Sequence, residues 1–251
     1  MAQFNSDGGL ACPRSTPAAR RLLAAGLVLG LSVAAAQAVE AVADGTQADA
    51  RRLVEDGNDA GAPAQGCFRY SMNGKAPPLG DPALVALESY ADFLARGAPV
   101  GENLPGRGYP ELSEPPKLDL VAGAQVYAAK CALCHGGRGE GQATADGRIV
   151  FPPLWGPRAY NWGAGMSSIH NAAGFIKANM PFSQGGTLSD PEAWDVAAFI
   201  DGQERPQDPR FNGSAAETRK AHHDDPLDLY GQTVNGVVLG EHAPPSGTVP
   251  R

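Results

Sequence analysis

Three residues near the middle of the chain have the types and the spacing to attach a redox cofactor. Cys131 and Cys134 are separated by two residues, and His135 follows the second cysteine directly. Two thiols at this spacing can add across the two vinyl groups of a haem, and the adjacent imidazole then reaches the iron. The motif therefore predicts one covalently attached haem c with His135 as an iron ligand, and the chemistry expected is electron transfer.

The same motif can also be half of a zinc site or a dithiol redox motif. A four-ligand zinc site would need a second Cys or His pair at short spacing. None follows, because His170 stands alone and His222 and His223 lie far along the chain in a polar stretch. A thioredoxin-like site would need alternating strands and helices, a pattern that the sequence does not show. We therefore favour haem over zinc or dithiol chemistry.

A second axial ligand for the iron must come from elsewhere in the chain. Besides Met1, the methionines are Met72, Met166 and Met180. We favour Met180, because it follows a predicted helix and the next residue, Pro181, favours an extended backbone at Met180. Met166 is the second choice, and any methionine can instead fill a gap in a core. A His/Met pair raises the reduction potential of a haem, which suits an electron carrier.

Apolar residues at helical spacing predict the elements that hold these groups. The three helices expected around the haem are one that ends at Cys131, one over residues 169–179, and one that begins at a capping box of Ser189 and Glu192. Gly123 gives the first helix a narrow face, so that it can cross the last helix closely. The predicted fold class is all-α, with a small cytochrome c-like domain and a truncated helical N-terminal segment. Such a domain has little core of its own, and the haem supplies much of its interior.

The start of the chain has the pattern of a secretory signal peptide. Basic residues precede an apolar stretch over residues 22–33, and Ala36-Gln37-Ala38 is a small-residue cleavage site. Cleavage near Ala38 would place the protein in the periplasm. The alternative is an uncleaved membrane anchor, although the apolar stretch is shorter than the roughly 20 residues that a membrane span needs.

The rest of the chain is predicted to divide at changes in composition and helical pattern. The predicted parts are a signal peptide at 1–38, a flexible lead at 39–66, a remnant of a first cytochrome domain at 67–97, a linker at 98–117, a cytochrome c domain at 118–205 and a C-terminal extension at 206–251. Within the remnant, Asp81 and Pro82 are expected to start a helix that ends at Gly97. The linker is rich in Pro and Gly.

The net charge of the chain is −7. An acidic protein is a poor match for nucleic acid, whose phosphates require clustered Lys and Arg, and is a better match for partners with a basic face. Cys67 would be left without a partner after haem attachment. It can form an intermolecular disulfide, remain a free thiol, bind a metal or pack as a small apolar side chain.

Several longer motifs resemble those of the dihaem thiosulfate dehydrogenases. The motifs are residues 67–75 (CFRYSMNGK), 104–110 (LPGRGYP), 131–135 (CALCH), 151–156 (FPPLWG), 163–166 (GAGM), 179–181 (NMP), 205–211 (RPQDPRF) and 230–236 (YGQTVNG). Together they cover most of residues 67–240. This resemblance implies a periplasmic enzyme that couples two thiosulfates to tetrathionate and passes electrons from an N-terminal active-site haem to a C-terminal His/Met haem.

The resemblance also implies roles for two residues. Cys67 aligns with the thiolate that ligates the first haem in that family, and Met180 aligns with the distal ligand of the second haem. This sequence has a single Cys-x-x-Cys-His motif, so the first haem site is expected to be missing. A truncated paralogue, a fragment, or a subunit that borrows the first haem from a partner would each have this pattern.

Three functions remain open from the sequence. The first is a periplasmic monohaem cytochrome that transfers electrons to and from redox partner proteins. The second is a thiosulfate dehydrogenase whose first haem comes from a partner, in which Cys67 is the candidate catalytic residue and Arg69 and Lys75 attract thiosulfate or tetrathionate. The third is a haem-binding sensor or structural subunit.

Overall fold

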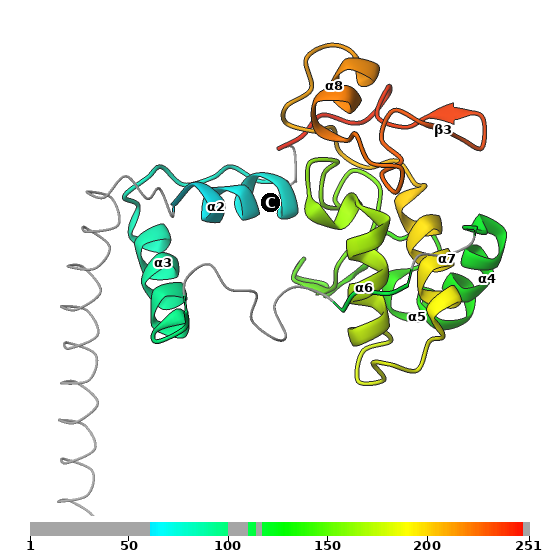
Figure 1. Ribbon diagram of the computed structural model, residues 1–251, viewed down its shortest axis with the longest axis horizontal. Helices are drawn as coiled ribbons and strands as arrows, with labels where there is room; N and C mark the ends of the chain where they lie inside the picture. The colour runs from blue at the N-terminus through cyan, green and yellow to red at the C-terminus, as the bar shows by residue number, and fades with distance from the viewer. Residues whose placement is uncertain (1–60, 100–109, 114–116, 248–251) are drawn as a thin grey trace, which may run out of the picture. The chain divides into compact units, whose positions relative to one another are not determined.

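The computed structural model describes residues 61–99, 110–113 and 117–247, and these residues fall within one compact unit of the chain, Asp59–Arg251 (Figure 1). The predicted signal peptide, residues 39–60 of the predicted flexible lead and most of the predicted linker lie outside the described residues. Within the described residues, no helix is both long and apolar enough to span a bilayer.

The secondary structure is mainly helical, which confirms the predicted all-α class. The helices are α2 (Gly61–Gly66), η1 (Cys67–Ser71), α3 (Pro82–Ala95), α4 (Leu120–Lys130), α5 (Ala132–His135), η2 (Gly165–Ser167), α6 (Ile169–Asn179), α7 (Asp190–Asp201) and α8 (Ala215–His222). Two short antiparallel pairs accompany them, β1 (Gln142–Ala143) with β2 (Ile149–Phe151) and β3 (Thr233–Val234) with β4 (Val237–Val238). Neither pair builds a layer of its own.

Side-chain caps fix where three of the helices begin. Asp81 accepts a hydrogen bond from the backbone N–H of Ala83 at the start of α3. The Asp119 carboxylate accepts two backbone N–H groups at the start of α4, at 2.9 and 3.0 Å. Ser189 and Glu192 form the predicted capping box of α7. Each cap satisfies backbone donors that would otherwise lack a partner, so the predicted starts of α3 and α7 are confirmed, and Asp119 is an N-cap that was not predicted.

The main core lies where α4, α6 and α7 pack together. Its buried members are Tyr127 on α4, Ile169, Ala172, Ala173 and Ile176 on α6, Leu188, and Ala193, Trp194, Val196, Ala197, Ala198 and Ile200 on α7. Alanines occupy five of these positions, so the helices approach closely. A methyl group at Gly123 would lie 2.0 Å from the carbonyl oxygen of Asp195 on α7, which confirms the predicted narrow face of α4.

Replacing Gly123 with alanine is expected to destabilise the fold. The new Cβ would overlap the backbone of Asp195, which cannot rotate away as a flexible side chain could. The helices α4 and α7 must therefore move apart. Overpacking of this kind costs about 1–3 kcal/mol in the free energy of unfolding. Denaturant unfolding of the purified protein measures this loss in the free energy of unfolding. Gly165→Ala is the control, because its Cβ would have only an ordinary contact of 3.8 Å with Asn171.

The residues after α7 fold back and bury a second cluster. Tyr230, Val234 and Leu239 pack with Trp162, which is fully covered. His223 is also buried, at 3% exposed, although the sequence placed it in a polar stretch. The C-terminal residues up to 247 are therefore part of the folded structure and contribute to its core.

Candidate functional site

Cys131, Cys134 and His135 lie on one helical turn. Cys131 ends α4 and begins α5, and its carbonyl oxygen accepts the backbone N–H groups of Cys134 at 3.1 Å and of His135 at 3.0 Å. Both cysteines are free thiols and partly buried. Burial raises the pKa of the Cys131 thiol to about 11, and the nearby Cys134 adds to this effect. A reactive dithiol would have a lowered pKa, so the electrostatics do not favour dithiol chemistry.

A backbone carbonyl fixes the orientation of the His135 ring. Its Nδ1 atom lies 2.9 Å from the carbonyl oxygen of Pro152. Because a carbonyl only accepts hydrogen bonds, Nδ1 carries the hydrogen and Nε2 keeps its lone pair for a metal. The Phe151 ring stands edge-on to His135, with the ring centroids 6.4 Å apart. This is the arrangement that orients a metal-binding histidine.

Aromatic side chains support the turn from α4 and α7. The Tyr127 ring lies 4.9 Å from Trp155 and 5.5 Å from Phe199, and its hydroxyl donates to the carbonyl oxygen of Gly136 at 2.7 Å. Gly139 has a positive φ, and a methyl group there would overlap the Trp155 ring at 2.2 Å. The segment that follows the motif is therefore held against the Trp155 ring.

The backbone of Met180 has the predicted extended conformation. Met180 caps the C-terminus of α6 with φ −113° and ψ 148°, and its N–H donates to the carbonyl oxygen of Ile176. The Met180 and Met166 side chains both pack against the core cluster that Cys131 also contacts. Met72 instead is 61% exposed on the segment after η1. Position thus favours Met180 and Met166 over Met72 as candidates for the second axial ligand.

The residues present fit a haem c. Two free thiols and an oriented imidazole share a turn, and two thioethers lie on the adjoining core. Apolar side chains beside the motif and beside Met180 are exposed: Leu133 by 87%, Ile149 by 56% and Phe182 by 77%. Within the described ranges, no group of three or more Cys, His, Asp or Glu side chains is arranged to hold a metal ion.

Cys67 is exposed at the start of η1 and forms no disulfide with the other described cysteines. Arg69 is also exposed, and Lys75 follows on the same exposed segment. The structure therefore leaves these three side chains open to solvent.

The structure also contains a buried ion pair that was not predicted from the sequence. Asp201, at the end of α7, lies 3.1 Å from the guanidinium of Arg205, and both side chains are fully covered. The guanidinium packs over the rings of Tyr160, at 4.4 Å, and Trp162, at 4.8 Å. The rings of Tyr160 and Trp162 thus enclose Arg205. Burial raises the pKa of Asp201 to about 7, although Arg205 acts in the opposite direction.

Comparison with known proteins places the motif in a family. Residues 119–200 match the family model of subunit III of cbb3-type cytochrome c oxidase. The thiosulfate dehydrogenase of Thiomonas intermedia is 59% identical over 182 residues, which cover 72% of this chain and 58% of the relative. The chain belongs to the thiosulfate dehydrogenase family. Its cofactor is haem c, and residues 119–200 form a cytochrome c domain.

Two further members of the thiosulfate dehydrogenase family agree with this assignment. The enzyme of Stutzerimonas stutzeri is 52% identical over 180 residues, which cover 70% of this chain and 58% of that protein. Among solved structures, the as-isolated form of thiosulfate dehydrogenase (TsdBA) from Marichromatium purpuratum has a TM-score of 0.67 and 52% identity, covering 72% of this chain and 41% of that chain. The chain spans less than three fifths of the length of these thiosulfate dehydrogenases.

Proposed function

We propose that this chain is a periplasmic monohaem c-type cytochrome that carries electrons in thiosulfate oxidation. The observation that supports this most directly is the turn with two free thiols and a histidine whose Nε2 lone pair is free to bind a metal. The haem supplies a centre that accepts and returns one electron. Family membership supports the connection to thiosulfate and tetrathionate.

The residues have distinct parts in this proposal. Cys131 and Cys134 attach the cofactor, and His135 orients it through the hydrogen bond to Pro152. Met180 provides a soft thioether that favours the reduced metal and raises the reduction potential. The exposed side chain of Leu133 gives partner proteins an apolar contact beside the attachment site. Such redox encounters are usually small and short-lived.

A redox titration tests the carrier function. The purified holoprotein should be reduced and reoxidised reversibly, with the same spectra in both directions. A haem-binding sensor or structural subunit would instead have an open coordination position and bind carbon monoxide readily. An irreversible titration, or rapid carbon monoxide binding by the native ferrous protein, would contradict the carrier proposal.

A second candidate function is thiosulfate dehydrogenase activity with a first haem supplied by a partner. The identity to two such enzymes favours it, and Cys67, Arg69 and Lys75 lie exposed on one segment where a partner can reach them. Joining two thiosulfates as tetrathionate releases two electrons, whereas one haem accepts one. Steady-state assays with thiosulfate and an artificial acceptor, with and without candidate partners, test it. Turnover only with a partner supports this function, and no turnover in either case excludes it.

Replacing Met180 with alanine should change the haem spectrum and potential. We expect the ferric sulfur-to-iron charge-transfer band to disappear, because the thioether is lost. The reduction potential should fall by on the order of 100 mV, a fraction of the roughly 0.8 V that axial ligands can span. Met166→Ala is the matched control, since Met166 packs against the same core. If Met166→Ala removes the band and Met180→Ala keeps it, the two ligand assignments are reversed.

A further inference from the structure

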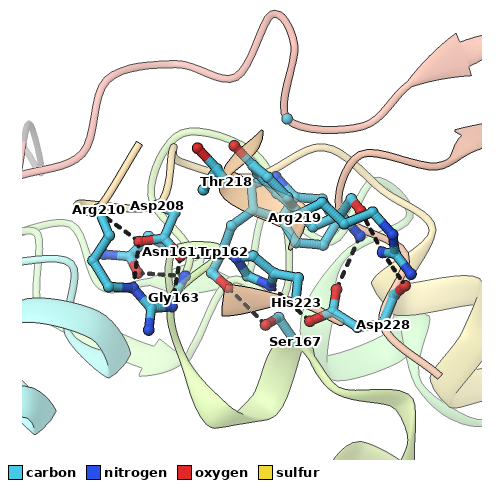
Figure 2. Close-up of polar contacts among 12 residues, drawn as sticks. Asn161, Trp162, Gly163, Ser167, Asp208, Arg210, Thr218, Arg219, His223 and Asp228 are labelled. Atoms are coloured by element: carbon cyan, nitrogen blue, oxygen red, sulfur yellow. Dashed lines mark hydrogen bonds and ion pairs between the residues drawn. The ribbon is translucent and has the colours of Figure 1, made fainter. Parts of the chain in front are cut away.

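A histidine in the C-terminal extension lies between two carboxylates. The Nδ1 atom of His223 is 2.7 Å from Asp228 Oδ2, and its Nε2 atom is 2.8 Å from Asp208 Oδ2 (Figure 2). The ring stacks on Tyr230, with the ring centroids 4.3 Å apart. His223 and Asp208 are almost completely buried, at 3% and 1% exposed. Neither the cytochrome motif nor the proposed function uses these residues.

Two ionised carboxylates at these distances are best satisfied by a positively charged ring. An ionised carboxylate only accepts hydrogen bonds, so both ring nitrogens of His223 must donate. A neutral imidazole has one N–H, and its other nitrogen would place a lone pair against a carboxylate oxygen. Burial alone would lower the pKa of His223, but the hydrogen bonds to Asp208 and Asp228 raise it above its ordinary value.

Two arginines also contact the residues around His223. Arg210 binds Asp208 with two hydrogen bonds, Nε to Oδ1 at 3.0 Å and Nη2 to Oδ2 at 2.7 Å. Burial would raise the pKa of Asp208, but the hydrogen bonds from His223 and Arg210 hold it well below its usual range. Arg219 donates to the carbonyl oxygens of Asp228 and Tyr230, at 2.8 and 2.5 Å. The carboxylates of Asp208 and Asp228 therefore face two cations, His223 and Arg210, and of these only the histidine is a side chain whose charge changes in the ordinary pH range of proteins.

The charged cluster extends to the segment that contains Cys67. The Arg210 guanidinium lies 5.2 Å over the ring of Tyr70 in η1. One edge of that ring is close to Gly163, where a methyl group would overlap it at 2.6 Å. Tyr70 is therefore held between Gly163, which precedes η2, and the C-terminal extension.

A buried asparagine also binds this segment through hydrogen bonds. The Asn161 Nδ2 atom donates to the carbonyl oxygen of Arg69 at 2.8 Å and to Asn73 Oδ1 at 3.0 Å. The backbone N–H of Gly247 also donates to Asn73 Oδ1, at 3.0 Å. Residues 67–74, the Cys67 segment, thus depend on contacts with residues that are about 90 to 170 positions away in the chain.

We propose that protonated His223 fastens the Cys67 segment to the cytochrome domain, and that loss of its proton releases the segment. His223 acts on the segment through Asp208, Arg210 and Tyr70, and is a positioning residue. Release would also move the Cys67 thiol, because Cys67 begins η1. The inference is independent of electron transfer, since it concerns the position of a segment and not the cycling of iron.

The pH dependence follows from the direction of each shift. His223 has a folded-state pKa above its ordinary 6.5, so its contribution is complete below pH 6.5 and is lost as pH rises through the folded-state pKa. Asp208 has a folded-state pKa below its ordinary 3.8, so its contribution is present above pH 3.8 and is lost in stronger acid. The segment should therefore be held tightly from weakly acidic pH and loosen on the alkaline side.

Hydrogen exchange of the full-length holoprotein, followed by mass spectrometry, tests the proposal. At each pH, the measured exchange rate of the Cys67 segment is divided by its intrinsic rate. The resulting ratio is compared with the same ratio for a peptide from α6. In His223→Gln, which can bond only one carboxylate as a donor, we expect exchange of the segment to rise about tenfold or more with α6 unchanged. His222→Gln, an exposed neighbour on α8, should match the native protein.

Two results would overturn the proposal. One is an equal rise in the Cys67 segment and α6, which would make His223 a general stability residue. The other comes from the native protein alone and does not depend on whether the variant folds: nitrogen-15 NMR that finds only one protonated ring nitrogen in His223 at pH 6. Two protonated nitrogens, with segment exchange that rises with pH relative to α6, support it.

Discussion

A chain in which Cys131 and Cys134 are both replaced with alanine is expected to lose covalently bound haem completely. Each thiol supplies one thioether bond, and no other described cysteine lies on the turn with His135. Secretion of the variant by a host that matures c-type cytochromes, followed by denaturing gel electrophoresis and haem staining, measures the loss. Each single replacement should retain at most one thioether bond and lower the yield of holoprotein.

Cys67→Ala is the matched control for this experiment. Cys67 is a free, exposed cysteine on η1, and its replacement should leave covalent haem at the native level. Haem that survives denaturation in the double variant would contradict the attachment site. Loss of covalent haem in the Cys67→Ala protein would assign Cys67 a part in attachment that the structure does not support.

Replacing Arg205 with leucine is expected to produce the largest loss of stability. The change leaves the Asp201 carboxylate fully buried without its cation and removes the hydrogen bond to the carbonyl oxygen of Ile200. Breaking one side of a buried ion pair costs about 3–5 kcal/mol in the free energy of unfolding. Denaturant unfolding at pH 7 measures the loss, and the near-ultraviolet signals of Tyr160 and Trp162 should change with it.

Two variants give the controls for Arg205. Arg96→Leu breaks an ion pair of the same spacing with Asp92, but both side chains are well exposed, so the expected change is within about 1 kcal/mol. The double variant Asp201→Leu with Arg205→Leu removes both charges and should recover much of the stability. If Arg205→Leu costs no more than Arg96→Leu, the buried pair does not stabilise the fold.

The parts of the structure that were predicted correctly are encoded locally. Asp81 and Ser189 begin helices as predicted, because a cap and its helix are adjacent in the chain. Cys131 to His135 fit within one turn, so their spacing alone indicates their chemistry. The close crossing at Gly123 was predicted because small residues on both helices permit a short distance between them.

The parts that were missed depend on distant pairs. His223 meets Asp208 from 15 residues away, and Asn161 meets Asn73 from 88 residues away, so no short pattern indicates either contact. Because His223 lies in a polar stretch of the sequence, its spacing gave no sign that it is buried. Asp201 and Arg205 are four residues apart at a helix end, a spacing that signals an ion pair but not its complete burial.

The axial methionine could be predicted only in part from the sequence. The sequence predicts the extended backbone at Met180 through Pro181, and the structure has that conformation. The side chain of Met166 packs against the same core from η2, however, and a contact of that kind cannot be seen in the spacing of residues. The thioether that binds iron is therefore assigned by the spectra of the two alanine variants.

The most direct test of the account is the haem content of the secreted, purified chain, measured by the pyridine haemochrome spectrum together with the intact mass. We expect one haem per polypeptide, bound through two thioether bonds and retained under denaturing conditions. A colourless mature protein, from a host that matures other c-type cytochromes, would contradict it.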